Sequence, residues 1–365
     1  MKDQINVVIR VRPLNERELS SIDQDGNRYN TWVVNGNSIS QKINTDNRSG
    51  TGLVYTFDQI YDMNVKTEDI YDGAVKDIIE STMNGINGTV FAYGQTSSGK
   101  TYTMYGDSKM PGLISIAVKK VFEHIRDKDV FVKDSTEQIV LGPQEVFSLL
   151  SKGEGNRHIG CTNMNERSSR AHTIFRMVIE SGDTIADQDK YNKRLSESIN
   201  DGNVFAGSVK ISTLSFVDLA GSERVGHTGA EGARLREGAH INKSLLALGT
   251  VIGRLSENGV NSAHVPYRDS KLTRILQPSL GGNSKTSIIC NITIAPQYME
   301  DTISTLKFAS RAKTITNMPE VNEELRGEAL LRRLKKVQLL EKEVAEMQRM
   351  VSLKDDKTEE NKKLE

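Results

Sequence analysis

The chain reads TVFAYGQTSSGKTYT from Thr89 to Thr103. Within it, Gly94 and the triplet Gly99-Lys100-Thr101 are spaced as in the complete phosphate-binding loop, G-x-x-x-x-G-K-[ST]. The residues before Gly94 are β-branched, aromatic or small, so a buried strand is predicted to lead into the loop and a helix to follow it. The alternative, a glycine loop that merely follows a strand, is disfavoured by the complete pattern.

Each residue type in this loop suits the phosphates of a nucleotide. Gly94 and Gly99 let the backbone turn its N–H groups inward around phosphate oxygens. Lys100 would place a positive charge on the β- and γ-phosphates, and Thr101 would offer a hydroxyl to Mg²⁺. A helix beginning here would add its dipole to the anion site.

Composition narrows the class of protein. The 365 residues include 48 Lys and Arg and 48 Asp and Glu, so no net charge favours nucleic acid or membrane as a partner. The two cysteines, Cys161 and Cys290, are too few for a disulfide framework and fit a reducing compartment. We expect a cytoplasmic protein, because the N-terminus has no apolar signal-peptide segment and no run of apolar residues is long enough to span a membrane.

Hydrophobic periodicity predicts strands and helices on both sides of the loop. Strands are expected at Ile5–Pro13, Trp32–Val34, Ser38–Ser40, Val54–Asp58, Thr173–Glu180, Val209–Val217 and Thr286–Ile294. Helices are expected at Thr67–Asn84, Ile114–Ile125, Pro143–Ser151, Ile241–Leu255, Arg268–Leu276 and Met299–Arg311, with a short connection at Asp127–Asp134 and a long polar loop at Ser181–Gly207. The pattern indicates an α/β P-loop sandwich, in which helices flank both faces of a central, mostly parallel to mixed sheet.

Two further blocks carry nucleotide chemistry. DLAGSE, Asp218–Glu223, follows a buried strand. In P-loop nucleotidases an aspartate at such a position holds Mg²⁺, here through water, and the glycine N–H reaches the γ-phosphate. The block NERSSRAH, Asn165–His172, is dense in hydroxyl, amide and guanidinium groups. The Asp-x-x-Gly pattern is weak alone and gains weight from the phosphate loop.

The segment from Arg224 to Lys285 is basic in a neutral chain. It holds nine Lys and Arg against four Asp and Glu. A basic face beside a nucleotide site suggests an acidic partner, and an ordinary solvated helix face is an equally weighted alternative on charge alone.

The C-terminal part shows two patterns. Thr314–Asn322 has no clear period and contains Pro319, which predicts a linker. Ala329–Leu353 is predicted to be helical, with a short heptad seam that would form a dimer or dock as an amphipathic helix. The seam residues are Val337, Leu340, Val344, Met347 and Val351.

Together these blocks resemble a kinesin motor head over most of residues 5–322. The neck, with Val321-Asn322-Glu323 and the run from Ala329, is most similar to the kinesin-7, centromere-associated group. The matching blocks, in family order, are Arg10–Pro13, Gly94–Thr101, Asn165–His172, Asp218–Glu223, Tyr267–Leu276, Leu280–Asn283 and Phe308–Lys313.

The resemblance implies an ATP-driven motor that moves toward microtubule plus ends. It implies ATP and Mg²⁺ as cofactors, tubulin as partner, a homodimer through a C-terminal coiled coil, and the microtubule cytoskeleton, including spindle or kinetochore, as location. The motor domain would span 1–313, the neck linker 314–328 and the neck helix 329–365. One alternative is a non-motile, microtubule-binding regulatory head. Another is a different P-loop enzyme, such as a GTPase or a small-molecule kinase. Against a GTPase, Asn242-Lys243-x-Leu245 lacks the aspartate that would read guanine, and against a kinase, no lid-like arginine cluster stands out.

The resemblance also implies residue roles. Arg10 and Pro13 would line the adenine and Tyr102 would stack on it, and Arg170 with Glu223 would close the two switches. The remaining cofactor-binding residues would be Arg12, Gly94, Gln95, Thr96, Ser97, Ser98, Gly99, Lys100 and Thr101. The catalytic set would be Lys100, Asn165, Ser168, Arg170, Gly221 and Glu223. The metal set would be Thr101, Ser169 and Asp218, and the microtubule-binding set Lys243, Arg254, Arg268, Lys271 and Arg274.

Two departures from the family pattern stand out. Ala171 occupies a position where kinesins usually have serine. Between Ile125 and Asp129 the chain lacks several tens of residues, including a strand, that kinesin heads normally carry. Loss of that strand would expose a new sheet edge, which bears on motility more than on nucleotide binding.

Overall fold

The computed structural model describes residues 2–20, 32–45, 48–125, 130–133, 140, 142–159, 171–182, 208–223, 233–258 and 264–325. The chain divides into two compact units, Met1–Ser181 with Ile211–Asn322 and Gly182–Lys210 with Glu323–Glu365. In the second unit, Ser208–Lys210 pairs antiparallel with Glu323–Leu325. The predicted neck helix at 329–365 lies outside the described residues.

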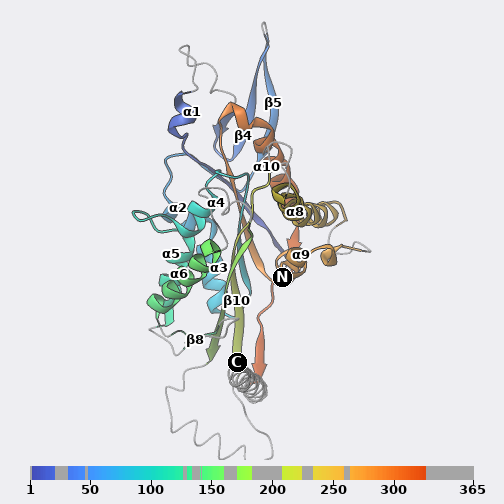
Figure 1. The fold of residues 1–365 in the computed structure, drawn as a ribbon. Coiled ribbons are helices and arrows are strands. Elements are labelled where there is room, and N and C mark those ends of the chain that lie inside the picture. Colours follow the sequence, from blue (N-terminus) through green and yellow to red (C-terminus); the bar gives the residue numbers. More distant parts are fainter. Residues whose placement is uncertain are drawn as a thin grey trace, which may run out of the picture. The chain divides into compact units, whose positions relative to one another are not determined.

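The first unit is built on a mixed central sheet (Figure 1), with strand order β6-β2-β11-β7-β10-β9-β8. Pairing is parallel from β6 to β10, and β8 pairs antiparallel with β9. These strands are β2 (Asn6–Val11), β6 (Gln59–Tyr61), β7 (Gly88–Tyr93), β8 (Val130–Lys133), β9 (Thr173–Gly182), β10 (Ser208–Asp218) and β11 (Lys285–Ile292). Smaller sheets join β1 (Asp3–Gln4) to β12 (Thr316–Asn317), and β3 (Trp32–Asn35) to β4 (Ser38–Thr45) and β5 (Arg48–Thr56), while β13 (Glu323–Leu325) pairs with β10.

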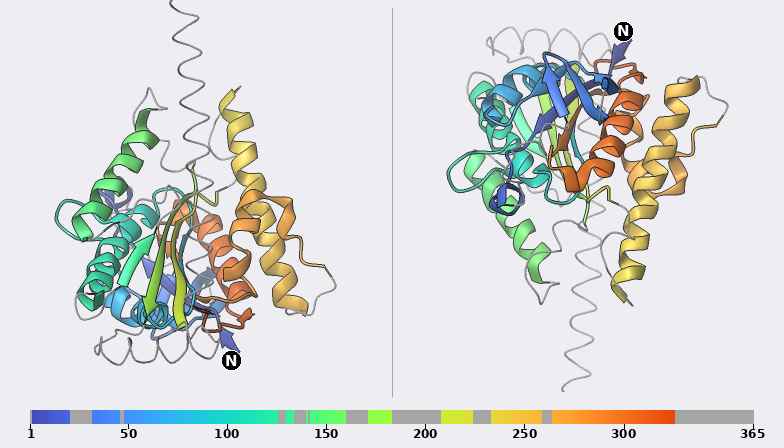
Figure 2. Two further views of the ribbon diagram at one scale, coloured as in Figure 1. Left: turned by 90° about the horizontal axis from the view of Figure 1, so that it is seen from below. Right: turned by 90° about the horizontal axis from the view of Figure 1, so that it is seen from above.

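Helices cover both faces of the sheet (Figure 2), which confirms the predicted sandwich. One side carries α2 (Thr67–Ala74), α3 (Lys76–Met83), α5 (Leu113–Ile125) and α6 (Pro143–Ile159). The other carries α8 (Ala233–Asn258), α9 (Lys271–Ile275) and α10 (Met299–Ala312). The shorter helices are α1 (Glu16–Ser20), α4 (Lys100–Tyr105), η4 (Tyr267–Asp269), η5 (Gln277–Ser279) and η6 (Pro296–Tyr298). Among the described helices, none is both long and apolar enough to cross a membrane.

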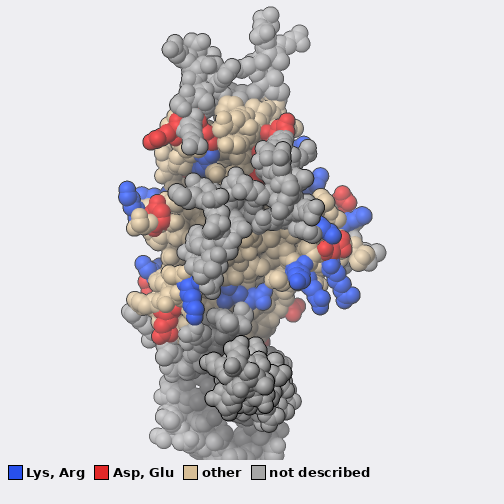
Figure 3. Space-filling view, viewed as in Figure 1, with Lys and Arg blue, Asp and Glu red and all other residues tan. Residues whose placement is uncertain are grey.

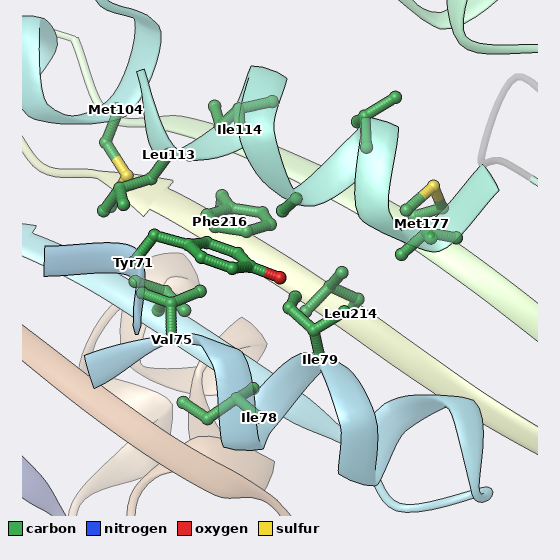
Figure 4. Packing of buried hydrophobic residues seen from close by; sticks show 14 of the residues in the cluster. Tyr71, Val75, Ile78, Ile79, Met104, Leu113, Ile114, Met177, Leu214 and Phe216 are labelled. Carbon is green, nitrogen blue, oxygen red and sulfur yellow. The ribbon is translucent and has the colours of Figure 1, made fainter. Parts of the chain in front are cut away.

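Two hydrophobic clusters hold these layers together, and strand alternation explains both. On β10, Leu214 and Phe216 face one cluster, and Val217 faces the other. Successive side chains point to opposite faces of a strand, so a sheet covered on both sides needs near-continuous apolar strands. Figure 4 shows Phe216 packed among Tyr71 of α2 and Ile114 of α5.

The predicted helix at Thr67–Asn84 is wrong as a single element. The helix is interrupted at Val75, where a φ of −123° departs from helical geometry. Helix α2 ends before this residue and α3 begins after it. Val75 is fully buried, and residues of both short helices join the same cluster. The break therefore turns two apolar faces onto one side of the sheet.

The predicted helix Arg268–Leu276 is also divided. Tyr267–Asp269 forms a 3₁₀ turn, and α9 begins at Lys271. Ser270 caps α9, because its Oγ accepts a 3.0 Å hydrogen bond from the Thr273 N–H. Two other helices, α6 and α8, are longer than predicted.

Two segments predicted to lack regular structure form short strands. Val130–Lys133, expected in a connection, forms β8. The expected linker forms β12 and continues along the first unit, where the Asn322 N–H donates to Gly85 O at 2.9 Å. Asn317 Nδ2 donates to Ser284 O at 2.7 Å and to Ser279 O at 3.1 Å. These contacts are made by backbone groups and an asparagine side chain, so no periodic pattern of apolar residues marks them in the sequence.

Candidate functional site

The phosphate loop lies where β7 ends and α4 begins, as predicted. Gly94 has φ +147°, and a Cβ there would lie 2.2 Å from Asn291 O of β11, so only glycine fits. Ser97 has φ +61°, a left-handed conformation that non-glycine residues seldom adopt and that concentrates at functional sites. Gln95 Oε1 and Ser98 Oγ are buried without a hydrogen-bond partner among the described residues. Such buried polar atoms in a glycine-rich loop fit a site that takes a polar ligand.

Lys100 begins α4 and is only 6% exposed. Its Nζ donates to Gly94 O at 2.9 Å and to Gln95 O at 2.6 Å. Burial lowers the pKa of Lys100 to about 8, and the charges of Asp218 and Glu223 oppose that shift. The side chain thus shapes the loop and holds a poorly solvated amine in it, where an anionic phosphate would stabilise the ammonium form.

The predicted metal ligands Thr101 and Asp218 lie together. Asp218 ends β10, opposite Ala92 of β7, and its Oδ2 accepts a 2.8 Å hydrogen bond from Thr101 Oγ1. Among the described residues, no cluster of three or more His, Cys, Asp or Glu could hold a metal by itself. The Thr101 hydroxyl and the Asp218 carboxylate fit Mg²⁺, which is commonly bound by few protein oxygens together with substrate phosphates and water. Ser169, the third predicted ligand, lies outside the described residues.

Glu223 contacts the phosphate loop directly. Its Oε2 accepts a 2.8 Å hydrogen bond from the Thr96 N–H, and its Oε1 accepts one from Thr96 Oγ1. Gly221 approaches this pair so closely that a Cβ would lie 2.3 Å from both Thr96 Oγ1 and Glu223 Oε2. The predicted partner of Glu223, Arg170, lies outside the described residues, as do Asn165 and Ser168.

Of the residues expected at the adenine, Arg10 lies beside Tyr102, which is 38% exposed. The Arg10 guanidinium lies 5.2 Å from the centre of the Tyr102 ring. Arg10 also donates to Thr103 Oγ1 at 2.9 Å and to Thr67 Oγ1 at 3.2 Å, so its donors are engaged inside the protein. Arg10 therefore supports the tyrosine ring through a cation–π contact, and Pro13 is exposed.

Sequence reasoning missed Glu18, which holds Arg12 against the phosphate loop. Arg12 Nε donates to Ser97 O at 2.6 Å, and its two terminal nitrogens donate to the Glu18 carboxylate at 2.5 and 2.7 Å. Glu18 is 1% exposed. Burial raises the pKa of Glu18, but hydrogen bonds from Arg12 and Asn15 outweigh it, and the net shift is downward.

We expect Glu18→Gln to lower the free energy of unfolding at neutral pH by about 1–3 kcal/mol, because the Arg12 guanidinium loses a buried charged partner. The folded-state pKa of Glu18 is lowered, so its stabilisation is present above the unfolded-state pKa and is lost as pH falls through the folded-state pKa. Urea unfolding of both proteins across acidic pH checks this. A difference that widened as pH fell would contradict it.

The five predicted microtubule-binding residues are all exposed and lie on neighbouring elements. In Figure 3, Lys and Arg side chains gather over the region where Figure 1 places α9. The residues are Lys243 and Arg254 on α8, Arg268 on η4, and Lys271 and Arg274 on α9. We call them the basic surface.

The kinesin motor domain model matches residues 10–130 and 126–315. The chain belongs to the kinesin family. The kinesin-like protein KIN-7O of Arabidopsis thaliana is 43% identical over 374 residues, covering 92% of this chain and 27% of its own length. Human centromere-associated protein E is 40% identical over 372 residues, covering 91% of this chain and 13% of its own length. The kinesin-7 resemblance is thus confirmed, and this kinesin chain spans about a quarter or less of these two relatives.

Solved kinesin structures share the fold. A fast kinesin superposes with a TM-score of 0.71 at 37% identity, covering 88% of this chain and 94% of that one. A KIF14 dimer with two heads bound to a microtubule superposes with a TM-score of 0.74 at 29% identity, covering 92% of this chain and all of that one.

The comparisons also bear on the shortened segment after Ile125. The family match falls into two pieces that meet at residues 126–130. The alignment with KIN-7O extends over 374 residues, more than the 365 of this chain. Relatives therefore carry residues without a counterpart here, and the interruption of the family match places a break where the sequence predicted one.

Proposed function

We propose that this kinesin is an ATP-driven motor that couples ATP hydrolysis to plus-end-directed movement along microtubules. The observation that carries the proposal is the position of Glu223 between two elements. Its carboxylate accepts hydrogen bonds from Thr96 in the phosphate loop, and its backbone oxygen accepts one at 3.4 Å from Asn242 of α8. Because α8 also bears part of the basic surface, the same helix would respond to the bound nucleotide and bind the microtubule.

ATP with Mg²⁺ is the proposed cofactor pair. Lys100 and the loop Gly94–Thr101 would bind the phosphates, and Tyr102 would stack on the adenine. Thr101 and Asp218, with Ser169, would hold Mg²⁺, which would screen the charge of the phosphates. Asn165, Ser168, Arg170, Gly221 and Glu223 would position water and the γ-phosphate.

The proposed partner of the basic surface is the acidic surface of tubulin. The relative KIF14 was solved in complex with a microtubule. Exposed positive charges accelerate and orient binding to an acidic partner more than they add affinity. Homodimerisation through residues 329–365 and residence on the microtubule cytoskeleton, including spindle or kinetochore, complete the proposal.

Plus-end movement is proposed through the neck linker, residues 314–328. In the structure its first residues lie along the motor core, held by Asn317 and Asn322. Docking of this segment in the ATP state would carry a partner head forward.

The second candidate is a non-motile microtubule-binding head with uncoupled ATPase. The shortened segment after Ile125 favours it, since β8 ends the sheet in the described part of the chain. Among the described residues, the nucleotide site lies at the ends of β7 and β10, with β9 between β10 and β8, and its hydrogen bonds do not use β8.

Steady-state ATPase activity of residues 1–365, with and without stabilised microtubules, tests the proposal. Strong stimulation supports the motor. ATP turnover without stimulation would favour the uncoupled head, and a preference for GTP would remove both. Gliding of microtubules on immobilised protein then separates movement from binding.

We expect the double variant Lys271→Ala with Arg274→Ala to raise the microtubule concentration for half-maximal ATPase about tenfold at low salt, because two exposed charges facing the partner are lost. The difference should shrink as salt rises, since screening weakens exposed charges. The control is Lys119→Ala, an exposed lysine on α5 across the sheet. Equal effects of the two changes would refute the basic surface as the binding face.

A further inference from the structure

His172 forms hydrogen bonds to two separate segments, the loop that follows β10 and the helix α8. It directly precedes β9. Its Nδ1 accepts a 3.0 Å hydrogen bond from the Ala220 N–H, and its Nε2 lies 2.7 Å from Ser244 Oγ. Because Nδ1 accepts, the ring proton is on Nε2, which donates to the serine hydroxyl.

Each of these partners is next to residues of the proposed nucleotide site or of the basic surface. Ala220 is fully buried between Asp218, the proposed metal ligand, and Gly221 beside Glu223. Ser244 follows Lys243 of the basic surface on α8. One imidazole ring therefore bridges the loop Asp218–Gly221 and α8, the helix that bears part of the basic surface.

The ring has the protonation state that this bridge needs. Burial, together with the nearby charge of Lys100, lowers the pKa of His172 to about 4. A neutral ring both accepts and donates, whereas an imidazolium could not accept from the Ala220 N–H. A further hydrogen bond between the segment Asp218–Glu223 and α8, from Asn242 Nδ2 to Glu223 O, is longer at 3.4 Å and correspondingly weaker.

We propose that His172 is a positioning residue that transmits movement of the loop Asp218–Gly221 to α8. This inference rests on the proposed function, because the role of the bridge is to make microtubule binding by the basic surface depend on the bound nucleotide. Coupling of this kind is reciprocal for binding, so microtubules would in turn act on nucleotide affinity through the same ring.

Hydrogen–deuterium exchange of α8 amides tests this without microtubules. The protein is compared with ADP and with a non-hydrolysable ATP analogue, each with Mg²⁺. His172→Asn keeps an oxygen near the position of Nδ1 and loses the reach to Ser244. Ser244→Ala removes only the hydroxyl. The matched control, Ser256→Ala, removes a hydroxyl from the same helix whose 2.8 Å hydrogen bond goes to Gly253 O within that helix.

The unaltered protein and Ser256→Ala should show exchange near Ser244 that differs between the two nucleotides by about threefold to tenfold, the range set by one net hydrogen bond. His172→Asn and Ser244→Ala should each lose this difference, and the double variant should lose no more than either, because one bridge is removed once. Thermal unfolding identifies any variant that is merely unstable. A difference that persisted in Ser244→Ala, or that the unaltered protein lacked, would overturn the proposal.

The two failures can be told apart. If microtubules do not stimulate the ATPase but exchange on α8 follows the nucleotide through His172, the motor proposal falls and the bridge stands. If stimulation is strong and unchanged in His172→Asn and Ser244→Ala, the motor proposal stands and the bridge falls.

Discussion

Replacing Gly221 with alanine is expected to lower ATP turnover at least about 100-fold while nucleotide binding changes only a few-fold, the loss typical of displacing one group that acts on the transition state. An added Cβ would lie 2.3 Å from Thr96 Oγ1 and from Glu223 Oε2, closer than any real contact. Glu223 or Thr96 must then move. Lys100 keeps its own contacts to Gly94 O and Gln95 O, so the phosphate loop retains its cation.

Turnover and binding of a fluorescent ATP analogue, measured on the same preparation, separate the two effects. The control is Gly253→Ala on α8, where a Cβ would meet nothing within 4 Å. That change should leave turnover intact and add up to about 1 kcal/mol of stability, because alanine favours a helix more than glycine does. Normal turnover in Gly221→Ala would show that Glu223 need not remain on Thr96.

The parts of this kinesin that could be predicted from sequence depend on local patterns. The phosphate loop is encoded within a few residues, because Gly94, Lys100 and Thr101 act through their own backbone neighbourhood. The strand periodicity of β7 and β10 also predicted the buried sheet, since both strands are covered on both faces. Asp218 and Thr101 were both expected at Mg²⁺, and in the structure they meet because the carboxyl ends of neighbouring parallel strands lie at one edge.

What could not be predicted depends on partners distant in sequence. Glu18 meets Arg12 and thereby Ser97, and His172 meets Ser244, 72 residues away. A buried glutamate or histidine carries no periodic signal, and its environment exists only after folding. The break at Val75 was missed because the apolar spacing of α2 and α3 continues across it, while tertiary packing decides the backbone.

The shortened segment after Ile125 was predicted to expose a new edge. In the structure β8 pairs with β9 through Val130–Lys133 and is the last strand of the sheet in the described residues. A short edge strand is one way in which natural sheets limit edge-to-edge association. The change thus lies three strands from β7, the strand that leads into the phosphate loop.

Lys100→Ala is expected to weaken nucleotide binding about 100-fold or more and to lower turnover about 1,000-fold, since a buried cation and its charge-assisted hydrogen bonds are lost together. The lysine has two tasks. Its Nζ ties Gly94 O to Gln95 O, which shapes the loop, and its charge would meet the phosphates. Isothermal titration with the ATP analogue and steady-state turnover measure both losses.

A matched change distinguishes charge at the loop from charge in general. Lys285 at the start of β11 pairs with Asp77 at 2.7 Å, and Asp77 is 80% exposed. Such a surface pair contributes at most about 1 kcal/mol, so Lys285→Ala should leave binding and turnover unchanged. Lys100→Ala should also unfold at a temperature close to that of the unaltered protein when no nucleotide is present, because burying the amine opposes its favourable contacts. If Lys100→Ala bound nucleotide normally, the loop would hold phosphate through its N–H groups alone, and the role of the buried lysine would be only to shape the loop.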